Sequence, residues 1–464
     1  MGVTRGRVVI VGGGLAGIAA ALDCARDGAA VTLVESRGRL GGAAYSFTRD
    51  GIVADNGQHV FLRCCTAYRD LLARLDAADL VALQPRLAIP VLAPGGRVAW
   101  LRRSGLPAPL HLAGALARFS HLGLKERLGV ARAMRALRRV DPEDAAAEGR
   151  AFGDWLREQG QDAAAMEAVW GLIARPTLNL DPADASLAQA AFVFQAGLLS
   201  DRAAGDVGYA RVPLSAIHDE AARRALALAG VEVRLRRGAT AIVPEGGGFR
   251  VEANTAPTLE AGAVILAVSH DRAARLLPAG AGVDLMRLAR LGRSPIVNLH
   301  VVYDRRVLAE PFAAGVQTPV QWIFDRSASA ELDSGQYLVV SLSAAEAELD
   351  MTVEDLRARY LRALAELLPA ASGARVETFF VTREHAATFR AGPGARALRP
   401  GPRTAIPGLV LAGSWTDTGW PATMEGAVRS GHSAACEALA VVERKPESAH
   451  NGAIPHRAPL VRTA

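Results

Sequence analysis

A glycine-rich loop near the start of the chain constrains the fold more than any other feature. Residues 8–11 form a continuous apolar run of the kind found in a strand buried on both faces. Gly12, Gly14 and Gly17 then satisfy the spacing G-x-G-x-x-G, and apolar residues at helical spacing follow. A second apolar run occupies residues 31–34. The order of strand, glycine loop, helix and strand predicts a parallel βαβ unit and an α/β fold.

This unit has the parts that are needed to hold a dinucleotide. Gly12 permits a tight turn, Gly14 lets backbone N–H groups approach a pyrophosphate, and Gly17 lets the helix pack on the strand. Leu15 and Ala16 open the predicted helix, whose N-terminus stabilises phosphate charge. The alternative is a βαβ turn with a purely structural role. It is disfavoured, because all of these parts occur in the order and spacing of a dinucleotide-binding unit.

The residues after the second strand indicate which dinucleotide is bound. Glu35 closes that strand, where its carboxylate can accept hydrogen bonds from adenosine ribose hydroxyl groups. Arg39 and the glycine pair that follows it resemble the extended fingerprint of flavin-dependent amine oxidases and carotenoid desaturases. The resemblance implies FAD, with the arginine near the pyrophosphate or ribityl chain and the glycine backbone close to the flavin. The cofactor contacts predicted in this stretch are Glu35, Ser36, Arg39, Gly41, Gly42 and Ala43.

A polar cluster at residues 55–59 lies in front of the apolar residues 60–62. In the same superfamily the corresponding stretch runs beside the isoalloxazine ring. The resemblance therefore implies flavin contacts from Gly57, Gln58 and His59. The residues alone also fit an ordinary Asn-Gly turn whose side chains are satisfied locally.

A second motif lies near the C-terminus of the chain. Residues 409–415 are read as a last buried strand that runs into a loop, and residues 424–439 as a helix. Helix N–H groups that face a flavin pyrimidine stabilise negative charge at N1 and O2 of the reduced ring. The resemblance implies an adenine contact at Ala239 and further cofactor contacts at Gly413, Ser414, Thr423, Met424 and Glu425. Ser414 stands where the superfamily usually has an acid, so we expect weakened FAD retention.

Residues 55–62, 386–389 and 415–431 resemble one group in particular, the squalene-associated FAD-dependent desaturases, now understood as hydroxysqualene dehydroxylases. The resemblance implies an FAD-dependent oxidoreductase that removes the hydroxyl of hydroxysqualene by reduction and gives squalene, in squalene and hopanoid biosynthesis. This chemistry needs an acid, an apolar cavity and a hydride donor. The catalytic candidates are Asp55 and His59, with Asp417 as a lesser one.

The expected substrate is an isoprenoid lipid, and the electrons are expected to come from outside the chain. No second dinucleotide fingerprint is found, because the glycines at 246–248 and 392–394 do not follow a strand-to-helix pattern. Free nicotinamide or a separate reductase therefore has to reduce the flavin. We expect no metal ion in the site.

Three other functions are compatible with parts of the sequence. A carotenoid or phytoene desaturase would transfer hydride in the opposite direction, from substrate to oxidised flavin. An amine oxidase is disfavoured, because that group uses a lysine near flavin N5 and residues 296–299 contain none. A non-catalytic lipid-binding protein with a decayed flavin site is supported only by Ser414.

The motifs predict a Rossmann-like FAD-binding domain interleaved with a substrate domain made of a mixed sheet and helices. Three separate stretches are assigned to the FAD-binding domain: 1–76, 206–275 and 396–442. Residues 77–205 are predicted as a helical substrate-binding or membrane-facing segment, residues 276–395 as the mixed sheet, and residues 443–464 as a disordered tail.

The net charge of +6 suits contact with an anionic surface, although arginine enrichment of a solvated surface explains it equally well. Residues 110–140 contain no proline and are predicted as a basic amphipathic helix. Lys125, Arg132, Arg135 and Arg139 fall on one arc of this helix, which can lie on anionic lipid or be solvated. We expect peripheral contact with the inner face of the cytoplasmic membrane, and no nucleic-acid partner.

The four cysteines indicate a reducing compartment, because they show neither C-x-x-C spacing nor a disulfide framework. The adjacent Cys64 and Cys65 are interpreted as two buried thiols rather than a redox pair. The first predicted strand begins too early for a signal peptide, and no run of 18 apolar residues occurs. The expected location is therefore the cytoplasm.

Overall fold

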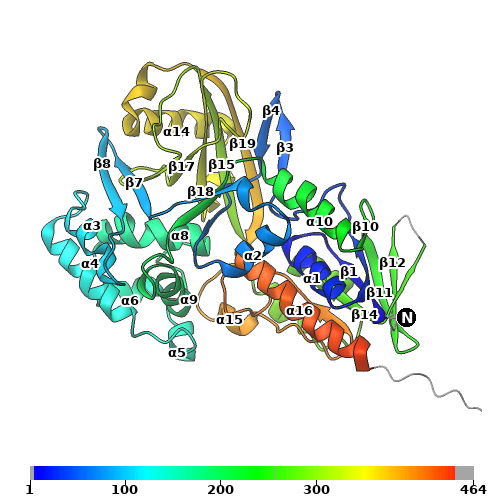
Figure 1. The fold of residues 1–464 in the computed structure, drawn as a ribbon. Coiled ribbons are helices and arrows are strands. Elements are labelled where there is room, and N and C mark those ends of the chain that lie inside the picture. Colours follow the sequence, from blue (N-terminus) through cyan, green and yellow to red (C-terminus); the bar gives the residue numbers. More distant parts are fainter. Residues whose placement is uncertain (1–4, 255–256, 445–464) are drawn as a thin grey trace, which may run out of the picture.

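The computed structural model describes residues 5–254 and 257–444. Its first unit is built on five parallel strands in the order β10-β2-β1-β14-β20 (Figure 1). These strands come from distant parts of the chain: β1 (Arg5–Val11), β2 (Ala29–Val34), β10 (Glu232–Arg234), β14 (Ala263–Leu266) and β20 (Leu409–Leu411). The parallel sheet confirms the predicted α/β class.

Each face of the parallel sheet is covered. One face carries three helices that contact one another or the sheet: α1 (Leu15–Arg26), α10 (Ala222–Leu228) and α16 (Met424–Arg444). The other face carries the antiparallel strands β11 (Ala239–Glu245), β12 (Gly248–Ala253) and β13 (Leu259–Ala261). Ile10 packs in the helix-side core and Val9 in the opposite core, and both are fully buried. Burial on both faces explains why β1 lacks polar alternation.

The second unit is a seven-stranded mixed sheet in the order β19-β15-β18-β17-β16-β7-β8. Its strands are β7 (Ala88–Ala93), β8 (Arg97–Arg102), β15 (Ser294–Tyr303), β16 (Phe312–Gly315), β17 (Trp322–Asp325), β18 (Gln336–Ser343) and β19 (Val376–Thr388). Val297, Leu299 and Val301 of β15 pack with α14 (Val353–Leu367). The alternate residues, including Asn298 and His300, face the opposite side of the strand, as the two-residue period requires.

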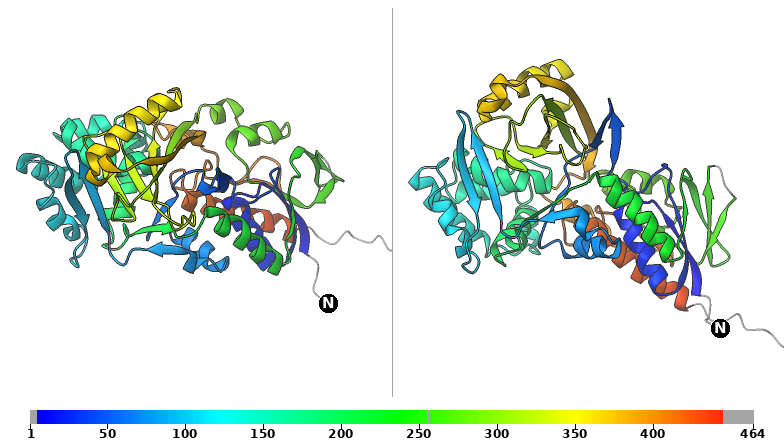
Figure 2. Two further views of the ribbon diagram at one scale, coloured as in Figure 1. Left: turned by 90° about the horizontal axis from the view of Figure 1, so that it is seen from above. Right: turned by 45° about the horizontal axis from the view of Figure 1, so that its top comes forward.

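That opposite side meets the hairpin of β3 (Ser46–Arg49) and β4 (Ile52–Asp55). Ile52 and Ala54 of the hairpin share a core with Val302, Tyr337 and Phe380 of the mixed sheet. The end of β4 therefore lies where the two large units meet, as Figure 2 shows from two further directions.

Residues 77–205 begin with strands, which corrects the prediction of a helical segment. β6 (Val81–Leu83), β7 and β8 precede the helices, and β6 joins β5 (Val60–Leu62) and β9 (Val207–Ala210) in a small sheet. Pro90 lies inside β7, where its neighbours Ile89 and Val91 are buried in the core. The apolar packing of this strand outweighs the proline, which favours loops in isolation.

Seven helices fill the remainder of this segment: α3 (Ala113–Ala117), α4 (Leu124–Leu137), α5 (Ala145–Glu148), α6 (Phe152–Glu158), α7 (Ala163–Ala165), α8 (Leu172–Leu178) and α9 (Leu187–Phe194). Five further helices lie elsewhere: α2 (Thr66–Arg74), α11 (His270–Leu276), α12 (Leu285–Ala289), α13 (Glu346–Leu349) and α15 (Ala395–Leu398).

The predicted helix over residues 110–140 is interrupted, which is a second correction. α3 ends at Ala117 and α4 begins only at Leu124, after the extended backbone of Gly123. His121 lies buried between them and its Nε2 is 2.8 Å from the Val91 carbonyl oxygen. Arg139 therefore lies beyond the end of α4.

The predicted disordered tail overlaps the end of α16, which continues to Arg444, and residues 445–464 lie outside the described residues. Cys64 and Cys65 are half-buried rather than fully buried. No helix in the described ranges is both long and apolar enough to cross a membrane.

Candidate active site

The first glycine loop has no room for side chains at two of its positions. A Cβ atom on Gly12, which has φ of 111°, would overlap the Ala267 carbonyl oxygen. A Cβ atom on Gly17 would overlap the Gly12 carbonyl oxygen. The Gly13 N–H donates to Glu35 Oε2 at 2.8 Å, so the acid at the end of β2 is held against the loop. The loop leads directly into α1, whose first residues are Leu15 and Ala16.

Glu35 also organises the turn that follows β2. Its Oε1 accepts hydrogen bonds from Ser36 Oγ at 3.0 Å and from the Arg37 N–H at 2.7 Å. Ala239 lies at the start of β11, and its neighbour Gly238 packs on Ser36, since a Cβ there would be 3.2 Å from Ser36 Cβ. The predicted adenosine contacts therefore lie side by side, although the Ala239 carbonyl already accepts from Arg272 at 2.8 Å.

The second glycine pair packs on the first loop. The Gly41 N–H donates to the Gly13 carbonyl oxygen at 2.9 Å. A Cβ atom on Gly42, which has φ of 59°, would be 2.8 Å from Gly14 Cα. The Arg39 guanidinium donates to the Gly42 carbonyl at 3.1 Å and lies 3.5 Å from the centre of the Tyr45 ring. Two motifs that are separated in the sequence thus form one continuous backbone surface.

The polar cluster at residues 55–59 lies between this surface and β15. Asn56 Nδ2 donates to the Ala43 carbonyl at 2.9 Å, and Asn298 Nδ2 donates to the Asn56 carbonyl at 3.0 Å. Asn298 Oδ1 and Gln58 Nε2 are buried, and neither has a partner among the described residues. Buried polar atoms are nearly always paired, so these two atoms indicate a ligand or water beside Gly57.

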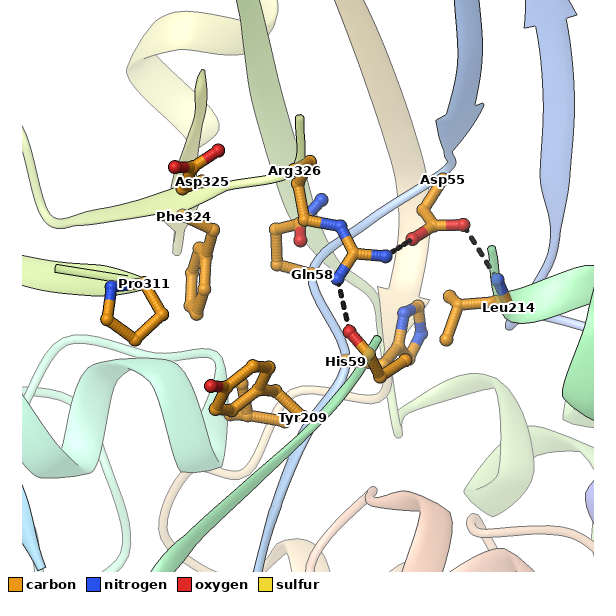
Figure 3. Close-up of a pocket in the computed structure, with 11 residues that line it drawn as sticks. Asp55, Gln58, His59, Tyr209, Leu214, Pro311, Phe324, Asp325 and Arg326 are labelled. Carbon is orange, nitrogen blue, oxygen red and sulfur yellow. Dashed lines mark hydrogen bonds and ion pairs between the residues drawn. The ribbon is translucent and has the colours of Figure 1, made fainter. Parts of the chain in front are cut away.

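A pocket opens beside this cluster (Figure 3). Its lining includes Gln58, His59, Tyr209, Phe324 and Arg326. Aromatic and polar side chains thus line the same pocket. Figure 3 shows the Arg326 guanidinium directed at the Asp55 carboxylate.

The geometry argues against Asp55 as the general acid. Arg326 Nη2 lies 2.7 Å from Asp55 Oδ2, and both side chains are at least nine-tenths buried. Asp55 Oδ1 accepts from Ser46 Oγ at 2.6 Å and from the Leu214 N–H at 2.9 Å. Both oxygens of this carboxylate are thus occupied by three protein donors, one of them a guanidinium, and neither is free to face a substrate. We therefore assign Asp55 a structural role.

His59 is also poorly suited to donate a proton near neutral pH. Burial lowers its pKa, so the neutral imidazole is favoured. His59 Nδ1 lies 3.1 Å from the Gly57 carbonyl oxygen, which can only accept, so Nδ1 carries the proton. His59 Nε2 is then an acceptor in the neutral ring.

The C-terminal motif forms the other half of the site. A Cβ atom on Gly413, at φ 140°, would overlap Trp415 Nε1, which donates to the Val268 carbonyl at 2.7 Å. α16 begins at Met424, as predicted, and Thr423 bonds to the N–H groups of Gly426 and Ala427.

The side chain of Glu425 is directed at α2, so the predicted cofactor contact at this position would come from its backbone. Its two carboxylate oxygens accept from the N–H groups of Ala67 at 3.1 Å and Tyr68 at 2.7 Å, and Arg429 pairs with it at 2.7 Å. The carboxylate therefore caps α2. Among the first four N–H groups of α16, those of Met424 and Glu425 have no hydrogen-bond partner among the described residues.

Ser414 and Asp417 lie on the loop between β20 and α16. The Ser414 carbonyl accepts from Arg399 Nη2 at 3.1 Å. Asp417 Oδ1 accepts from the Gly419 N–H at 3.2 Å, and its Oδ2 lies 3.6 Å from Arg396 Nε. Asp417 does not line the pocket beside His59. The structure therefore does not bring the three catalytic candidates together.

Two glycine loops, an acid at the end of β2 and a helix N-terminus from the far end of the chain thus converge on the parallel sheet. A family model described as flavin containing amine oxidoreductase matches residues 15–439. The chain belongs to this family. It is an FAD-dependent oxidoreductase, which confirms the predicted cofactor and enzyme class.

Proteins of known name resemble the chain over nearly its whole length. Hydroxysqualene dehydroxylase of Rhodopseudomonas palustris is 30% identical over 440 residues, which cover 93% of this chain and 98% of that protein. Zeta-carotene desaturase of Zea mays is 25% identical over 467 residues, which cover 92% of this chain and 82% of that protein. The solved structure of a putrescine oxidase triple mutant matches with a TM-score of 0.71 at 21% identity. The match covers 94% of this chain and 99% of that one, and it shows that the two proteins share a fold.

The residues present fit FAD. Gly12 and Gly17 let β1, the first loop and α1 pack closely, Gly42 lets the second loop lie against Gly14, and the N-terminus of α1 lies at the same edge. Gln58 Nε2 is a buried donor and Asn298 Oδ1 a buried acceptor, and neither is paired among the described residues. The polar edge of a flavin ring has groups that can pair with both atoms.

Sequence reasoning missed the polar partners that come from distant strands. Asn298 and His300 were detectable in part, because they are the polar residues of an otherwise apolar strand. Arg326 carries no local signal, since its partner Asp55 is 271 positions away.

Proposed function

We propose that this enzyme removes the hydroxyl group of hydroxysqualene by reduction and forms squalene. The observation that carries the proposal is the end-to-end similarity to a hydroxysqualene dehydroxylase, together with the assembled flavin motifs. In the proposed step the allylic carbon–oxygen bond breaks with both electrons on oxygen. The oxygen takes up a proton and leaves as water, and a hydride adds to the carbon. Bound FAD, once reduced, supplies that hydride.

Each part of the chain has a proposed task in this reaction. The glycine loops and α1 bind the pyrophosphate, Glu35 binds the adenosine ribose, and the first N–H groups of α16 stabilise charge on the pyrimidine edge. Gln58 and Asn298 orient the ring through their free polar atoms. Tyr209 and Phe324 offer apolar surface to the hydrocarbon chain of the substrate in the pocket beside His59.

The electron donor is proposed to be external, as reduced nicotinamide dinucleotide or a reductase protein. The parallel sheet accounts for one dinucleotide site. The glycines at 246–248 connect two antiparallel strands, β11 and β12, rather than a strand and a helix. These three glycines therefore form no second pyrophosphate-binding turn.

Three alternatives are less well supported. A carotenoid desaturase remains the second candidate, because zeta-carotene desaturases are 25% identical over 92% of the chain. An amine oxidase would need a lysine on β15, where the residue that contacts the 55–59 cluster is Asn298. A non-catalytic lipid-binding protein is disfavoured by the family match and by the intact glycine loops.

The reaction is tested by product analysis under anaerobic conditions. FAD-loaded enzyme, reduced chemically before mixing, is incubated with hydroxysqualene, and oxidised enzyme is incubated with phytoene. The proposal expects squalene from the first mixture and unchanged phytoene from the second. Desaturated phytoene with no squalene would reverse the direction of hydride transfer and favour the carotenoid alternative.

We further propose that α4 and the segment before it contact an anionic membrane. Leu106, Leu110, Leu124 and Leu128 are between 53% and 68% exposed, and they concentrate in residues 106–128. Lys125, Arg132 and Arg135 of α4 are exposed as well. Figure 1 shows α4 at the edge of the molecule opposite the parallel sheet. Exposed leucines interspersed with basic residues match the interface of an anionic bilayer.

Vesicle flotation tests this surface. Wild-type protein is expected to float with vesicles that contain phosphatidylglycerol and to bind less to pure phosphatidylcholine. Leu124→Asp combined with Leu128→Asp should abolish flotation, whereas Leu228→Asp, at an exposed leucine on α10, should not. If the Leu124/Leu128 double variant floated as well as the Leu228 variant, the proposed membrane contact would be wrong. The cytoplasmic location stays a prediction.

A further inference from the structure

A second pocket lies between the helical segment and the loop that leads into α16. Glu148 of α5 and Gln189 and Phe192 of α9 form one wall. Arg399 and Trp420 form another. Because the same loop continues into the N-terminus of α16, this pocket adjoins the C-terminal half of the flavin site.

The positive and negative charges of this pocket are equal in number, and most of them form ion pairs or hydrogen bonds within the protein. Arg396 pairs with Glu143 at 2.5 Å. Glu148 accepts from the Arg396 N–H at 2.7 Å and from Ser186 Oγ at 2.7 Å. With Arg399, the lining contains two guanidinium groups and two carboxylates. An anion therefore gains no net attraction there, and the pocket favours a neutral ligand.

Two polar side chains in the pocket have atoms without hydrogen-bond partners among the described residues. Gln189 is 8% exposed, and neither its Nε2 nor its Oε1 has a hydrogen-bond partner among the described residues. Arg399 is 7% exposed, and its Nε is likewise unpaired, although its Nη2 bonds to the loop after β20. Burial without partners is costly, so these atoms are expected to meet a ligand group.

The unpaired atoms define the chemistry of that group. The Gln189 amide offers a donor and an acceptor, and Arg399 Nε–H offers a second donor. A hydroxyl group accepts two hydrogen bonds and donates one, so it matches all three. Phe192 and Trp420, whose ring centres are 5.1 Å apart, provide an apolar surface for the adjoining hydrocarbon.

We propose that this pocket binds the hydroxyl-bearing part of the alcohol substrate, with Gln189 and Arg399 holding the hydroxyl group. The inference rests on the proposed function and adds the residues that recognise the group to be removed. Gln189 is also the most informative position to change, because it has no partner in the protein to lose. Arg399 is unsuitable, because it supports the Ser414 carbonyl.

The test is a binding titration of the FAD-loaded, oxidised enzyme, followed by the change in flavin absorbance. Wild type is expected to bind hydroxysqualene more tightly than squalene, which lacks the hydroxyl group. Gln189→Leu should weaken binding of hydroxysqualene about tenfold, the effect of losing about one good hydrogen bond. Squalene binding and FAD content should not change. Gln159→Leu, outside both pockets, is the matched control.

The outcomes separate this inference from the proposed function. Unchanged binding of hydroxysqualene to Gln189→Leu, or equal weakening of both ligands, would overturn the inference and leave Gln189 as a space-filling or water-binding residue. Equal affinity of wild type for the two ligands would overturn it as well. If the hydroxyl preference depends on Gln189 but reduced enzyme forms no squalene, the proposed reaction fails while the hydroxyl site stands.

Discussion

At the scale of single residues, the Asp55–Arg326 pair joins the hairpin of β3 and β4 to the mixed sheet. Arg326 also donates to the Ala210 carbonyl at 2.6 Å, so the pair connects three parts of the chain beside His59. Removing one member of a buried ion pair leaves the other charge without compensation. Asp55 is therefore expected to matter for stability before it matters for chemistry.

Asp55→Asn should lower the free energy of unfolding by about 3–5 kcal/mol, because the buried Arg326 guanidinium loses its counter-charge. Chemical denaturation measures this change. Asp154→Asn, which breaks an exposed pair with Arg157, should have little effect. If the folded Asp55→Asn protein kept full stability but lost single-turnover activity, the general-acid assignment would have to be restored.

Two buried histidines give the protein a defined pH dependence. Burial lowers the pKa of His218 and of His300 to about 3, so both are neutral in the folded protein. In the unfolded chain the same imidazoles have an ordinary pKa near 6.5. Below that pH the unfolded state therefore binds protons that the folded state does not bind. Stability should therefore fall as the pH drops from about 6.5 toward 3, by about 2 kcal/mol for each histidine at pH 5.

Denaturation at pH 7 and pH 5 measures this effect. His300→Gln should reduce the loss of stability between the two pH values by about 2 kcal/mol, because one titrating group is removed. His385→Gln, at an exposed position, is the matched control. If the His300 variant lost as much stability between pH 7 and pH 5 as wild type, His300 would have to be protonated in the folded protein.

At the scale of elements, the glycine loop and its two flanking strands determine cofactor binding. Gly17→Ala should yield protein with little or no bound FAD, because the added methyl group would push α1 away from β1. Flavin absorbance per mole of protein is the measurement. Gly105→Ala, where the added Cβ meets open space, should retain FAD. Normal flavin content in the Gly17 variant would contradict the assigned contact.

The elements that the sequence predicted well are those with a strong periodic or glycine signal. β15 covers residues 294–303 as expected, and α16 begins at Met424, because burial on one or both faces dictates their patterns. β7 and β8 were missed because Pro90 and the prolines around them favour loops locally. The residues that complete the pockets, such as Arg326 and Arg399, depend on long-range packing that no local pattern encodes.

At the scale of the whole molecule, the FAD-binding sheet is assembled from strands at both ends of the chain and from its middle. The mixed sheet and the helical segment are inserted between these strands (Figures 1 and 2). One pocket lies beside His59, and the other lies beside Trp420, between the helical segment and the loop before α16. This architecture is shared by oxidases and desaturases of the family, so the direction of hydride transfer has to be measured.

The central claim is that reduced flavin in this protein gives its electrons to an alcohol. Anaerobic stopped-flow mixing of the reduced holoenzyme with hydroxysqualene tests it most directly, with flavin absorbance recorded and squalene quantified after one turnover. The proposed function predicts return of the oxidised flavin band with one squalene formed per flavin. A reduced flavin that stays reduced, with no squalene formed, would contradict it.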